Sequence, residues 1–368
     1  MKRIPFPIIY VEGDAYERGY QYGSQCRKLI EESVNVYHKI FEVDSNMDWE
    51  AALRLARKFT APIEKYDPPS IEEMRGIAKG SGQDFDSILA MNARTELMLS
   101  REAGGLGACT TLAATSEATS SRHMLMAQNW DMKVTTAKLA VILKEKQNNG
   151  PNIVQLVEAG IIGKIGYNSA GVCVLANIMV SDGWHLGVPM QIILRKIMNQ
   201  ENLVDAMGVV LSAKRASSGN YLIGYAGEEG NEAVDIEAAP DYYNVLWPSD
   251  GTIAHANHFS INNPNIRDLF PPLDPGSLNR EHRATKLLSK EHGNITAAAI
   301  KKILRDHFDK KGSGSICCHV DPHLDESQQW LTIGSLVIDL NDKTLEIAKG
   351  PPCENKYIAL TFDDIMQV

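Results

Sequence analysis

The sequence predicts an α+β fold in which antiparallel sheets lie between helical layers, with a helical region at the N-terminus. Three observations predict it. Before residue 101, apolar side chains recur at helical spacing; after residue 109, short strands follow one another without intervening helices; and two later pairs of helices separate further strands. A chain of 368 residues can hold one large domain with a helical N-terminal part.

The N-terminal helices are indicated by periodicity and by their end signals. A break at 67–69 precedes Ser70, which can cap a helix that starts at Ile71 and has two acidic residues in its first turn. Gly80 and Gly82 end that helix, and a further helix is capped near 84–87. The helices are therefore expected over 14–42, 48–66, 71–80 and 84–99.

The rest of the chain reads mainly as strands. A polar loop at 116–122 joins the first two strands and sets Asn129, Trp130 and Asp131 at a strand end. The last two strands form a hairpin around Asn341-Asp342. Strands are expected over 110–114, 124–128, 139–143, 153–156, 163–167, 172–176, 220–226, 233–237, 253–258, 331–339 and 344–348, and helices over 188–198, 203–213, 280–290 and 297–306.

Composition and charge exclude several classes of function. Hydrophobic residues make up 44% and charged residues 23%, which is typical of a globular protein. A net charge of -9 and a pI of about 5.6 disfavour binding to a polyanion, so nucleic acid is not expected as a partner. Residues 1–10 contain two prolines and no small-residue cleavage site, and no apolar run approaches the roughly 20 residues that span a bilayer. We therefore expect a cytoplasmic protein without a membrane anchor.

Cysteine usage predicts neither a disulfide framework nor a zinc site. The six cysteines are sparse for the length, and no C-x-x-C pair occurs among them. They stand at positions 26, 109, 173, 317, 318 and 353. Most are expected to be buried thiols, and no metal or other cofactor is expected.

Cys109 is the candidate nucleophile. A thiolate attacks carbonyl carbon, but no neighbour of Cys109 in sequence is an obvious base. Cutting the Ala108-Cys109 bond would create an α-amino group, with a pKa of about 7.7–8.0, on the same residue as the sulfur. Gly104, Gly105 and Gly107 permit the strained backbone that an N-to-S acyl shift requires. From the residues alone, a thiol buried in packing stays the commoner interpretation.

A series of short motifs, in order over nearly the whole chain, changes that balance. They are Met-Arg-Gly-Ile-Ala-Lys-Gly-Ser-Gly (74–82), Asn-Ala-Arg-Thr-Glu-Leu (92–97), Cys-Thr-Thr (109–111), Gln-Asn-Trp-Asp (128–131), Gly187-Val188-Pro189, His-Ala-Asn-His-Phe (255–259) and Gly-Pro-Pro-Cys-Glu (350–354). Each motif alone is weak, whereas their succession is specific. Together they resemble the isopenicillin N acyltransferase family (acyl-coenzyme A:6-aminopenicillanate acyltransferases and related amide hydrolases), which are N-terminal-nucleophile (Ntn) enzymes.

The resemblance implies a fold, a maturation step and an activity. The fold would be the four-layer αββα sandwich of Ntn hydrolases. The precursor, a zymogen, would cleave itself before Cys109 to give a small chain of 1–108, the helical leader, and a catalytic large chain of 109–368. The product would be an amidohydrolase that acts on a small-molecule amide through an acyl-enzyme. The family's penicillin-making members have Gly where this chain has Ala108, which leaves the occurrence and rate of cleavage open.

The resemblance also assigns further site residues. Thr111 matches a threonine close to the nucleophile, and Asp131 matches an acidic residue that orients the new amino terminus. Asn257 matches the amide that helps to hold the oxyanion, which is chemically sensible for a fixed N–H donor. Ser277 and Arg280 match a Ser/Arg pair near the site, although Asn279 is an alternative for the serine.

Two other chemistries are disfavoured by the residues. His255 and His258 could suggest a metal, but no Cys or carboxylate stands at ligand spacing beside them. Cys317, Cys318 and His319 could suggest a Cys/His dyad, but adjacent residues on a strand face opposite ways.

Two alternative functions and the assembly state remain open. The chain could instead be an acyltransferase that moves an acyl group from a coenzyme A thioester or an amide to an amine, or a noncatalytic single-chain binding protein of the same fold. Expected partners are a small-molecule amide or thioester and the two chains of the precursor itself. A homo-oligomer is neither predicted nor excluded.

Overall fold

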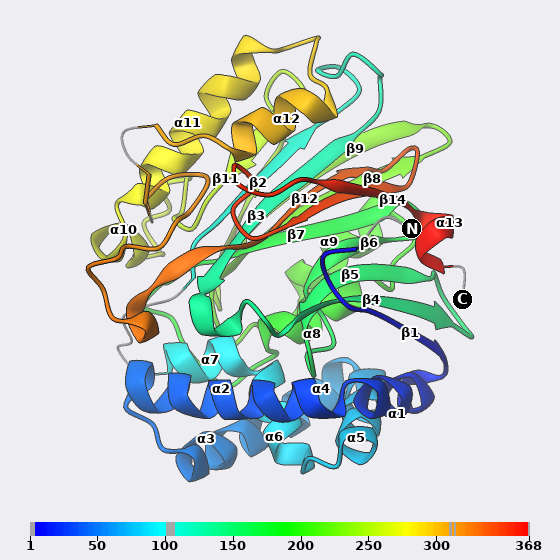
Figure 1. Ribbon diagram of the computed structural model, residues 1–368, viewed down its shortest axis with the longest axis vertical. Helices are drawn as coiled ribbons and strands as arrows, with labels where there is room; N and C mark the ends of the chain where they lie inside the picture. Colours follow the sequence, from blue (N-terminus) through cyan, green and yellow to red (C-terminus); the bar gives the residue numbers. More distant parts are fainter. Residues whose placement is uncertain (1–3, 101–106, 309–310, 313, 367–368) are drawn as a thin grey trace.

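Two β-sheets stack at the centre of the computed structural model, which describes residues 4–100, 107–308, 311–312 and 314–366 (Figure 1). The first has the order β1-β4-β5-β6-β7-β8-β9-β10, and the second β11-β2-β3-β12-β13-β14. The first sheet comprises β1 (Ile8–Gly13), β4 (Ala140–Gln147), β5 (Ile153–Glu158), β6 (Ile165–Asn168), β7 (Val172–Ile178), β8 (Gly219–Gly227), β9 (Gly230–Ala238) and β10 (Tyr243–Leu246). The second comprises β2 (Cys109–Ala114), β3 (Leu125–Lys133), β11 (Thr252–His255), β12 (Trp330–Asp339), β13 (Thr344–Lys349) and β14 (Ile358–Thr361).

Helices cover the outer face of each sheet. α8 (Met190–Ile197) and α9 (Leu203–Ser212) pack on strands β7, β8 and β9 of the first sheet. α11 (Gly276–Lys290) and α12 (Ala297–Leu304) pack on strands β2, β3, β11 and β12 of the second. Strands β2 and β3 contact β7 across the interface between the sheets. The layers therefore follow the predicted αββα order, and α10 (Phe270–Leu273) and α13 (Phe362–Met366) are short additions.

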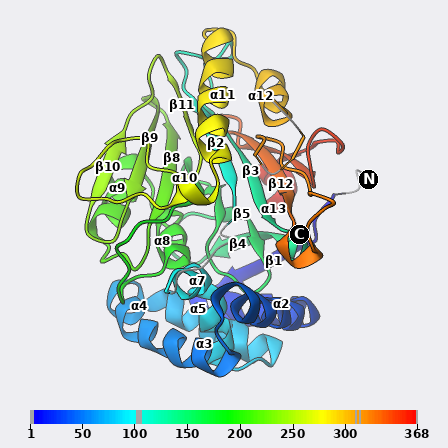
Figure 2. The ribbon, with the colours of Figure 1, turned by 90° about the vertical axis from the view of Figure 1, so that its left-hand side faces the viewer.

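The N-terminal helices gather at one end of the molecule, beneath both sheets (Figure 2). They are α1 (Ala15–Gln25), α2 (Arg27–Ser45), α3 (Trp49–Ala56), α4 (Thr60–Tyr66), α5 (Pro68–Ser81), α6 (Phe85–Asn92) and α7 (Arg94–Leu99). Strand β1 precedes them and pairs in parallel with β4, so the N-terminal segment also contributes an edge strand that the sequence pattern did not reveal. Among the described residues, no helix is both long enough and apolar enough to cross a membrane.

The glycine-rich motif at 74–82 has a packing role, as its helical periodicity suggested. Gly76 and Gly80 of α5 face α1, and the two backbones are in direct contact there. A Cβ on Gly80 would lie 2.8 Å from the backbone nitrogen of Ser24, and a Cβ on Gly76 would lie 2.7 Å from that of Tyr20. Any side chain at these positions would push the two helices apart.

The motif at 92–97 joins the helical region to the sheets through buried polar contacts. The Asn92 Nδ2 donates to the carbonyl of Gly160 at 2.9 Å, and the Arg94 guanidinium lies 3.0 Å from the Glu158 carboxylate. The Glu96 carboxylate accepts the backbone N–H of Met190 at 2.9 Å. All three motif side chains are fully buried, so breaking these contacts would leave polar groups unpaired.

Two predicted boundaries near the site were wrong. Asn129, Trp130 and Asp131 lie inside β3 rather than at its end, because β12 pairs with β3 as far as Lys133. The strand expected over 253–258 ends at His255, so Asn257 lies on the segment that leaves the sheet. Gly104 and Gly105 lie outside the described residues.

Candidate active site

Cys109 is the first residue of β2, and its position is fixed by the β2–β3 hairpin. It pairs with Trp130, and the carbonyl of Ala108 accepts the backbone N–H of Asp131 at 3.1 Å. Every residue of both strands is buried. The Ala108-Cys109 peptide is therefore held by a strand ladder at the point where the chain enters the core.

The side chain of Asn257 faces the Cys109 backbone. Its Oδ1 accepts the backbone N–H of Cys109 at 2.9 Å. Its Nδ2 donates to the carbonyl of Ile178 at 2.9 Å and, over a longer 3.4 Å, to the carbonyl of Gly107. The carbonyl partners fix which way the amide points, so Oδ1 and one N–H donor of Asn257 face residues 107–109, while the other donor faces the end of β7.

Arg280 places a buried positive charge beside Cys109. Its guanidinium donates to the carbonyl of Cys109, to the Thr110 Oγ1 at 3.3 Å and to the Asn257 Oδ1 at 3.1 Å. The Asp274 carboxylate, at 3.2 Å, is its ionic partner. Because the planar Arg280 guanidinium hydrogen-bonds both the Cys109 carbonyl and the Asn257 side chain, it fixes the position of these two residues relative to each other.

Ser277 lies one helical turn before Arg280 and also contacts the Asn257 segment. Its Oγ accepts the backbone N–H of Asn257 at 2.8 Å and lies 2.9 Å from the His258 Nδ1. Ser277 and Arg280 are fully buried, whereas Asn279 is partly exposed. The structure therefore places Ser277, rather than Asn279, next to the site.

Thr111 is tied to the strand that leads to Asn257. Its Oγ1 donates to the carbonyl of His255 at 3.3 Å and accepts from the Asn177 Nδ2 at 3.0 Å. These bonds connect β2 with β11 and, across the sheet interface, with β7. All six residues predicted for the site are buried, and Thr111 is linked to Asn257 through β11 rather than by a direct side-chain bond.

The carboxylate of Asp131 is buried, and only one of its two oxygens has a hydrogen-bond partner among the described residues. Its Oδ1 accepts from the Thr332 hydroxyl at 2.6 Å, while its Oδ2 has no hydrogen-bond partner among the described residues. Burial raises the pKa of Asp131 to about 7. Burial, together with the nearby charge of Asp131, also raises the pKa of the Cys109 thiol to about 11. In the uncut chain the thiol therefore holds its proton at neutral pH.

Lys164, just before β6, is a buried cation of the site that the sequence analysis missed. Its ammonium lies 5.0 Å from the centre of the Trp130 ring, and burial lowers the pKa of Lys164 to about 8. Its charge favours the Cys109 thiolate and so lowers the pKa of that thiol. The signal available in the sequence was a lysine next to an apolar strand. That this lysine is buried follows only from the packing of distant strands.

The two histidines that flank Asn257 are engaged with protein groups. The His255 Nε2 lies 2.9 Å from the Glu237 carboxylate. Although burial opposes it, the charge of Asp235 and the hydrogen bond to Glu237 raise the pKa of His255 to about 10. A protonated imidazole has no free lone pair, so His255 in this setting is a poor metal ligand. The His258 ring bonds Ser277 instead.

Replacing Asp131 by Asn is expected to change how stability depends on pH. Burial raises the pKa of Asp131 from 3.8 to about 7, so between those pH values the folded chain keeps a proton that the unfolded chain has lost. This difference in proton binding makes the free energy of unfolding fall by up to about 4 kcal/mol as pH rises from 4 to 7. Asp131→Asn has no titrating carboxyl group at this position and therefore removes this pH dependence. Urea unfolding of Cys109→Ala and of Cys109→Ala/Asp131→Asn across this range measures the difference. The exposed Asp241→Asn in the same background is the control, and equal slopes in the two test proteins would refute the prediction.

A family model, a curated relative and solved structures are similar to this chain. The sequence model of the acyl-coenzyme A:6-aminopenicillanic acid acyl-transferase family matches residues 117–353. The acyl-coenzyme A:6-aminopenicillanic-acid-acyltransferase 40 kDa form of Emericella nidulans is 29% identical over 299 residues, which cover 80% of each protein. Among solved structures, a variant of conjugated bile acid hydrolase from Clostridium perfringens aligns with a TM-score of 0.46 and 12% identity over 69% of this chain and 93% of that one. Penicillin V acylase from Agrobacterium tumefaciens aligns with a TM-score of 0.46 and 10% identity over 70% of this chain and 88% of that one.

Proposed function

The chain belongs to the acyl-coenzyme A:6-aminopenicillanic acid acyl-transferase family and is an enzyme of acyl transfer or amide hydrolysis, and from this premise we propose a self-processing amidohydrolase with Cys109 as its nucleophile. One observation carries the proposal: the peptide before Cys109 is enclosed by buried groups suited to both cleavage and catalysis. Asn257, Arg280 and the backbone N–H of Asp131 all bond to residues 107–109.

Self-cleavage begins with attack of the Cys109 sulfur on the carbonyl carbon of Ala108. The carbon–sulfur bond forms, the carbon–nitrogen bond breaks, and the nitrogen takes a proton to become the free amine. The Asp131 N–H, 3.1 Å from the Ala108 oxygen, stabilises the charge that develops there. The Asp131 carboxylate, with its pKa of about 7 and a charge that acts on the Cys109 thiol, accepts the thiol proton near neutrality and passes it to the departing nitrogen. Water then hydrolyses the thioester and releases the Ala108 carboxylate.

The new amine becomes the base of the mature enzyme. With a pKa of about 7.7–8.0 in its ordinary range, it can take the proton of the thiol on its own residue. The Asn257 Oδ1, which accepts the Cys109 N–H in the uncut chain, holds it from one side. The unpartnered Asp131 Oδ2 is the second acceptor, and Arg280 keeps the Cys109 carbonyl in place.

Cleavage also frees the oxyanion donor. The Asn257 Nδ2 makes its longer bond, at 3.4 Å, to the carbonyl of Gly107, which is no longer tethered to Cys109 once the chain is cut. The oxygen of a substrate amide can then take the place of the Gly107 carbonyl and receive the same N–H. The thioester acyl-enzyme is resolved by water. The contacts of Asn92, Arg94 and Glu96 keep the two chains together after the cut.

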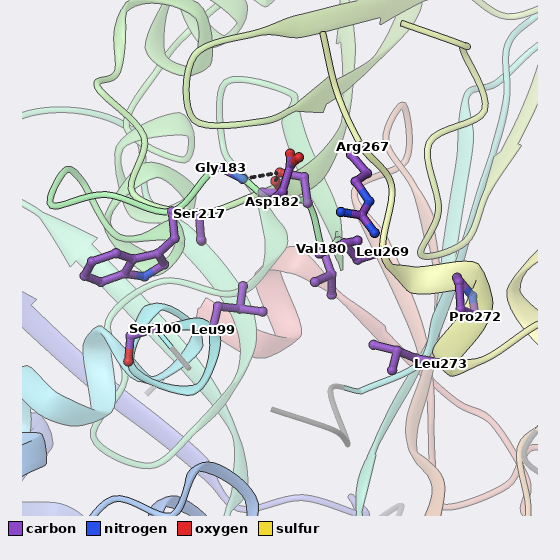
Figure 3. Close-up of a pocket in the computed structure, with 13 residues that line it drawn as sticks. Leu99, Ser100, Val180, Asp182, Gly183, Ser217, Arg267, Leu269, Pro272 and Leu273 are labelled. Atoms are coloured by element: carbon purple, nitrogen blue, oxygen red, sulfur yellow. Dashed lines mark hydrogen bonds between the residues drawn. The ribbon is translucent and has the colours of Figure 1, made fainter. Parts of the chain in front are cut away.

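A pocket of about 650 Å³ beyond the end of β7 is the proposed acyl-binding site. Figure 3 shows Leu99 from α7 and Leu273 from α10 on opposite sides of it, with Val180 and Leu269 between them. Val180 comes shortly after Ile178, whose carbonyl holds the Asn257 Nδ2, so one chain segment links the pocket lining to the oxyanion donor, although Asn257 and Cys109 do not line the pocket themselves. The volume suits a small molecule, and these apolar side chains suit an acyl group, while Asp182 and Arg267 add a charge of each sign to the lining.

Narrowing this pocket is expected to select against long acyl groups. For acyl p-nitroanilides with long acyl chains, Leu273→Trp should lower kcat/KM by about 10-fold relative to the wild type, because the indole fills space that the acyl group needs. Processing should be unaffected. Val204→Trp, at an exposed position of α9 outside the pocket lining, is the matched control. An unchanged chain-length profile in Leu273→Trp would place the acyl group elsewhere.

The product of the reaction separates hydrolysis from acyl transfer. The Emericella relative is named as an acyltransferase, which keeps transfer as the second candidate. Purified protein is incubated with amides and with acyl-coenzyme A thioesters, each with and without an acceptor amine, and products are identified by mass spectrometry. Free acid in all cases supports the hydrolase, whereas an amide formed only with the acceptor supports the transferase. A fully processed protein that forms neither product would refute both.

A further inference from the structure

Four metal-binding side chains meet on the far side of the second sheet from β7, at a place that the proposed chemistry does not use. His307 follows α12, Cys317 and His319 lie in the segment before β12, and Cys353 follows β13. One ligand atom of each lies within 4.8 Å of all the others. We propose that these four residues bind a zinc ion in a closed, structural Cys2His2 site.

The distances between the ligand atoms fit tetrahedral coordination. In a tetrahedron with zinc–nitrogen bonds of about 2.0 Å and zinc–sulfur bonds of about 2.3 Å, neighbouring ligand atoms stand about 3.3–3.8 Å apart. The Nε2 atoms of His307 and His319 are 3.0 Å apart. The His319 Nε2 lies 3.4 Å from the Cys317 sulfur and 3.2 Å from the Cys353 sulfur. Two of these three distances are slightly shorter than the expected range, so a bound zinc ion would need to move the ligand atoms only slightly apart.

Hydrogen bonding alone accounts poorly for this arrangement. The His319 Nε2 has either one proton or one lone pair, yet three polar atoms face it, from His307, Cys317 and Cys353. At most one of the three contacts can be a good hydrogen bond at a time. An ion at the centre satisfies all four atoms at once, and the two thiols release their protons to solvent on binding. Two sulfurs and two imidazoles with tetrahedral geometry favour zinc.

The surroundings match a structural site. Cys317 and His319 are buried, and all four positions of the tetrahedron are filled by protein, so none is open to a substrate. On the outer side, the Glu354 carboxylate lies 3.7 Å from the other ring nitrogen of His319, where a carboxylate can orient a zinc-bound imidazole. The ion would crosslink the turn at 350–354 to the segment that precedes β12.

That segment reaches the active site through one intermediate residue. The backbone N–H of Cys318, between two of the ligands, donates to the Thr332 hydroxyl at 3.0 Å. The same hydroxyl donates to Asp131 at 2.6 Å. Zinc therefore positions Thr332, and through it the carboxylate that the processing reaction uses, without touching the reacting atoms.

The cysteine spacing, with no C-x-x-C pair, predicted no zinc site. Three of the ligands lie between α12 and β12, and the fourth lies between β13 and β14. The argument against a Cys/His dyad also assumed a strand at 317–319; that stretch is irregular, and Cys317 and His319 are in contact.

The test measures metal content and coordination rather than activity. The full chain, without a histidine tag, is purified from zinc-supplemented medium, and zinc is quantified by elemental analysis and native mass spectrometry. We expect about one zinc per chain in the wild type and in Cys318→Ala, the neighbouring thiol outside the cluster, and almost none in Cys317→Ala/Cys353→Ala. Replacing zinc by cobalt(II) should give the intense visible bands of a tetrahedral site with thiolate-to-cobalt charge transfer.

A conservative variant keeps the test decisive if the double variant does not fold. Cys353→His retains four ligands and should keep the metal while losing about half of the charge-transfer intensity, with unchanged circular dichroism. The proposal is overturned by a wild type without stoichiometric zinc, by a weak six-coordinate cobalt spectrum, or by a Cys317–Cys353 disulfide in protein purified without oxidant. None of these outcomes depends on whether the chain cleaves itself.

Discussion

Replacing Cys109 by Ala is expected to leave the chain uncut and to abolish amide hydrolysis. The sulfur is proposed to act twice, first on the carbonyl of Ala108 and then on the substrate, and alanine can do neither. Loss of a covalent nucleophile lowers kcat by roughly 10⁶-fold. Intact mass reports cleavage, and product formation from a reactive p-nitroanilide reports catalysis. The substitution removes one buried sulfur, so folding should be retained.

Cys173→Ala is the matched control for this experiment. Cys173 is as buried as Cys109 and lies in β7, within the first sheet, so its removal creates a similar small cavity without touching the proposed nucleophile. It should be processed and active. If Cys109→Ala were cut or active, another residue would have to be the nucleophile, and the proposed mechanism would be wrong.

The second large effect is expected for Asn257→Ala. This change removes the N–H donor proposed for the substrate oxyanion and the acceptor that holds the Cys109 amine. The loss of one oxyanion donor lowers kcat by about 10²–10³-fold, with little change in KM because the bond is strongest in the transition state. Rates are divided by the processed fraction, measured by intact mass, so that slow cleavage is not mistaken for slow catalysis.

Asn168→Ala provides the comparison for Asn257. Asn168 is equally buried and its Nδ2 also donates to two carbonyls, those of Met198 and Gln200, on a different part of the first sheet. Both variants lose similar hydrogen bonds and should lose similar stability. Only Asn257→Ala should lose kcat, and an equal loss of kcat in both would assign Asn257 a purely structural role.

Local patterns could predict the layers of the fold and the residues with recognisable motifs. Helical and alternating periodicities are local, so most helices and the meander of the first sheet were predictable. Cys109 and Asn257 were named from short motifs, Ser277 and Arg280 from the family resemblance, and the structure brings all four together. The extent of β3 past Asp131 was not predictable, because it depends on pairing with β12 some two hundred positions later.

The residues that were missed share one property, which is that distant segments determine their environment. β1 was missed although its Ile-Ile-Tyr-Val run favours a strand, and its place in the fold depends on the edge that β4 offers it. Lys164 and Thr332 look ordinary in sequence and matter only because burial places them beside Cys109 and Asp131. The His307–Cys353 cluster likewise requires two separate segments to meet.

The central claim, that the protein exposes Cys109 by cutting its own backbone, is tested most directly by intact mass and N-terminal sequencing of the purified full-length chain. Our account predicts two chains that copurify, of about 12 and about 29 kDa by their share of the 40.6 kDa total, the larger beginning at Cys109. A single active chain of 40.6 kDa that begins at Met1 would contradict it.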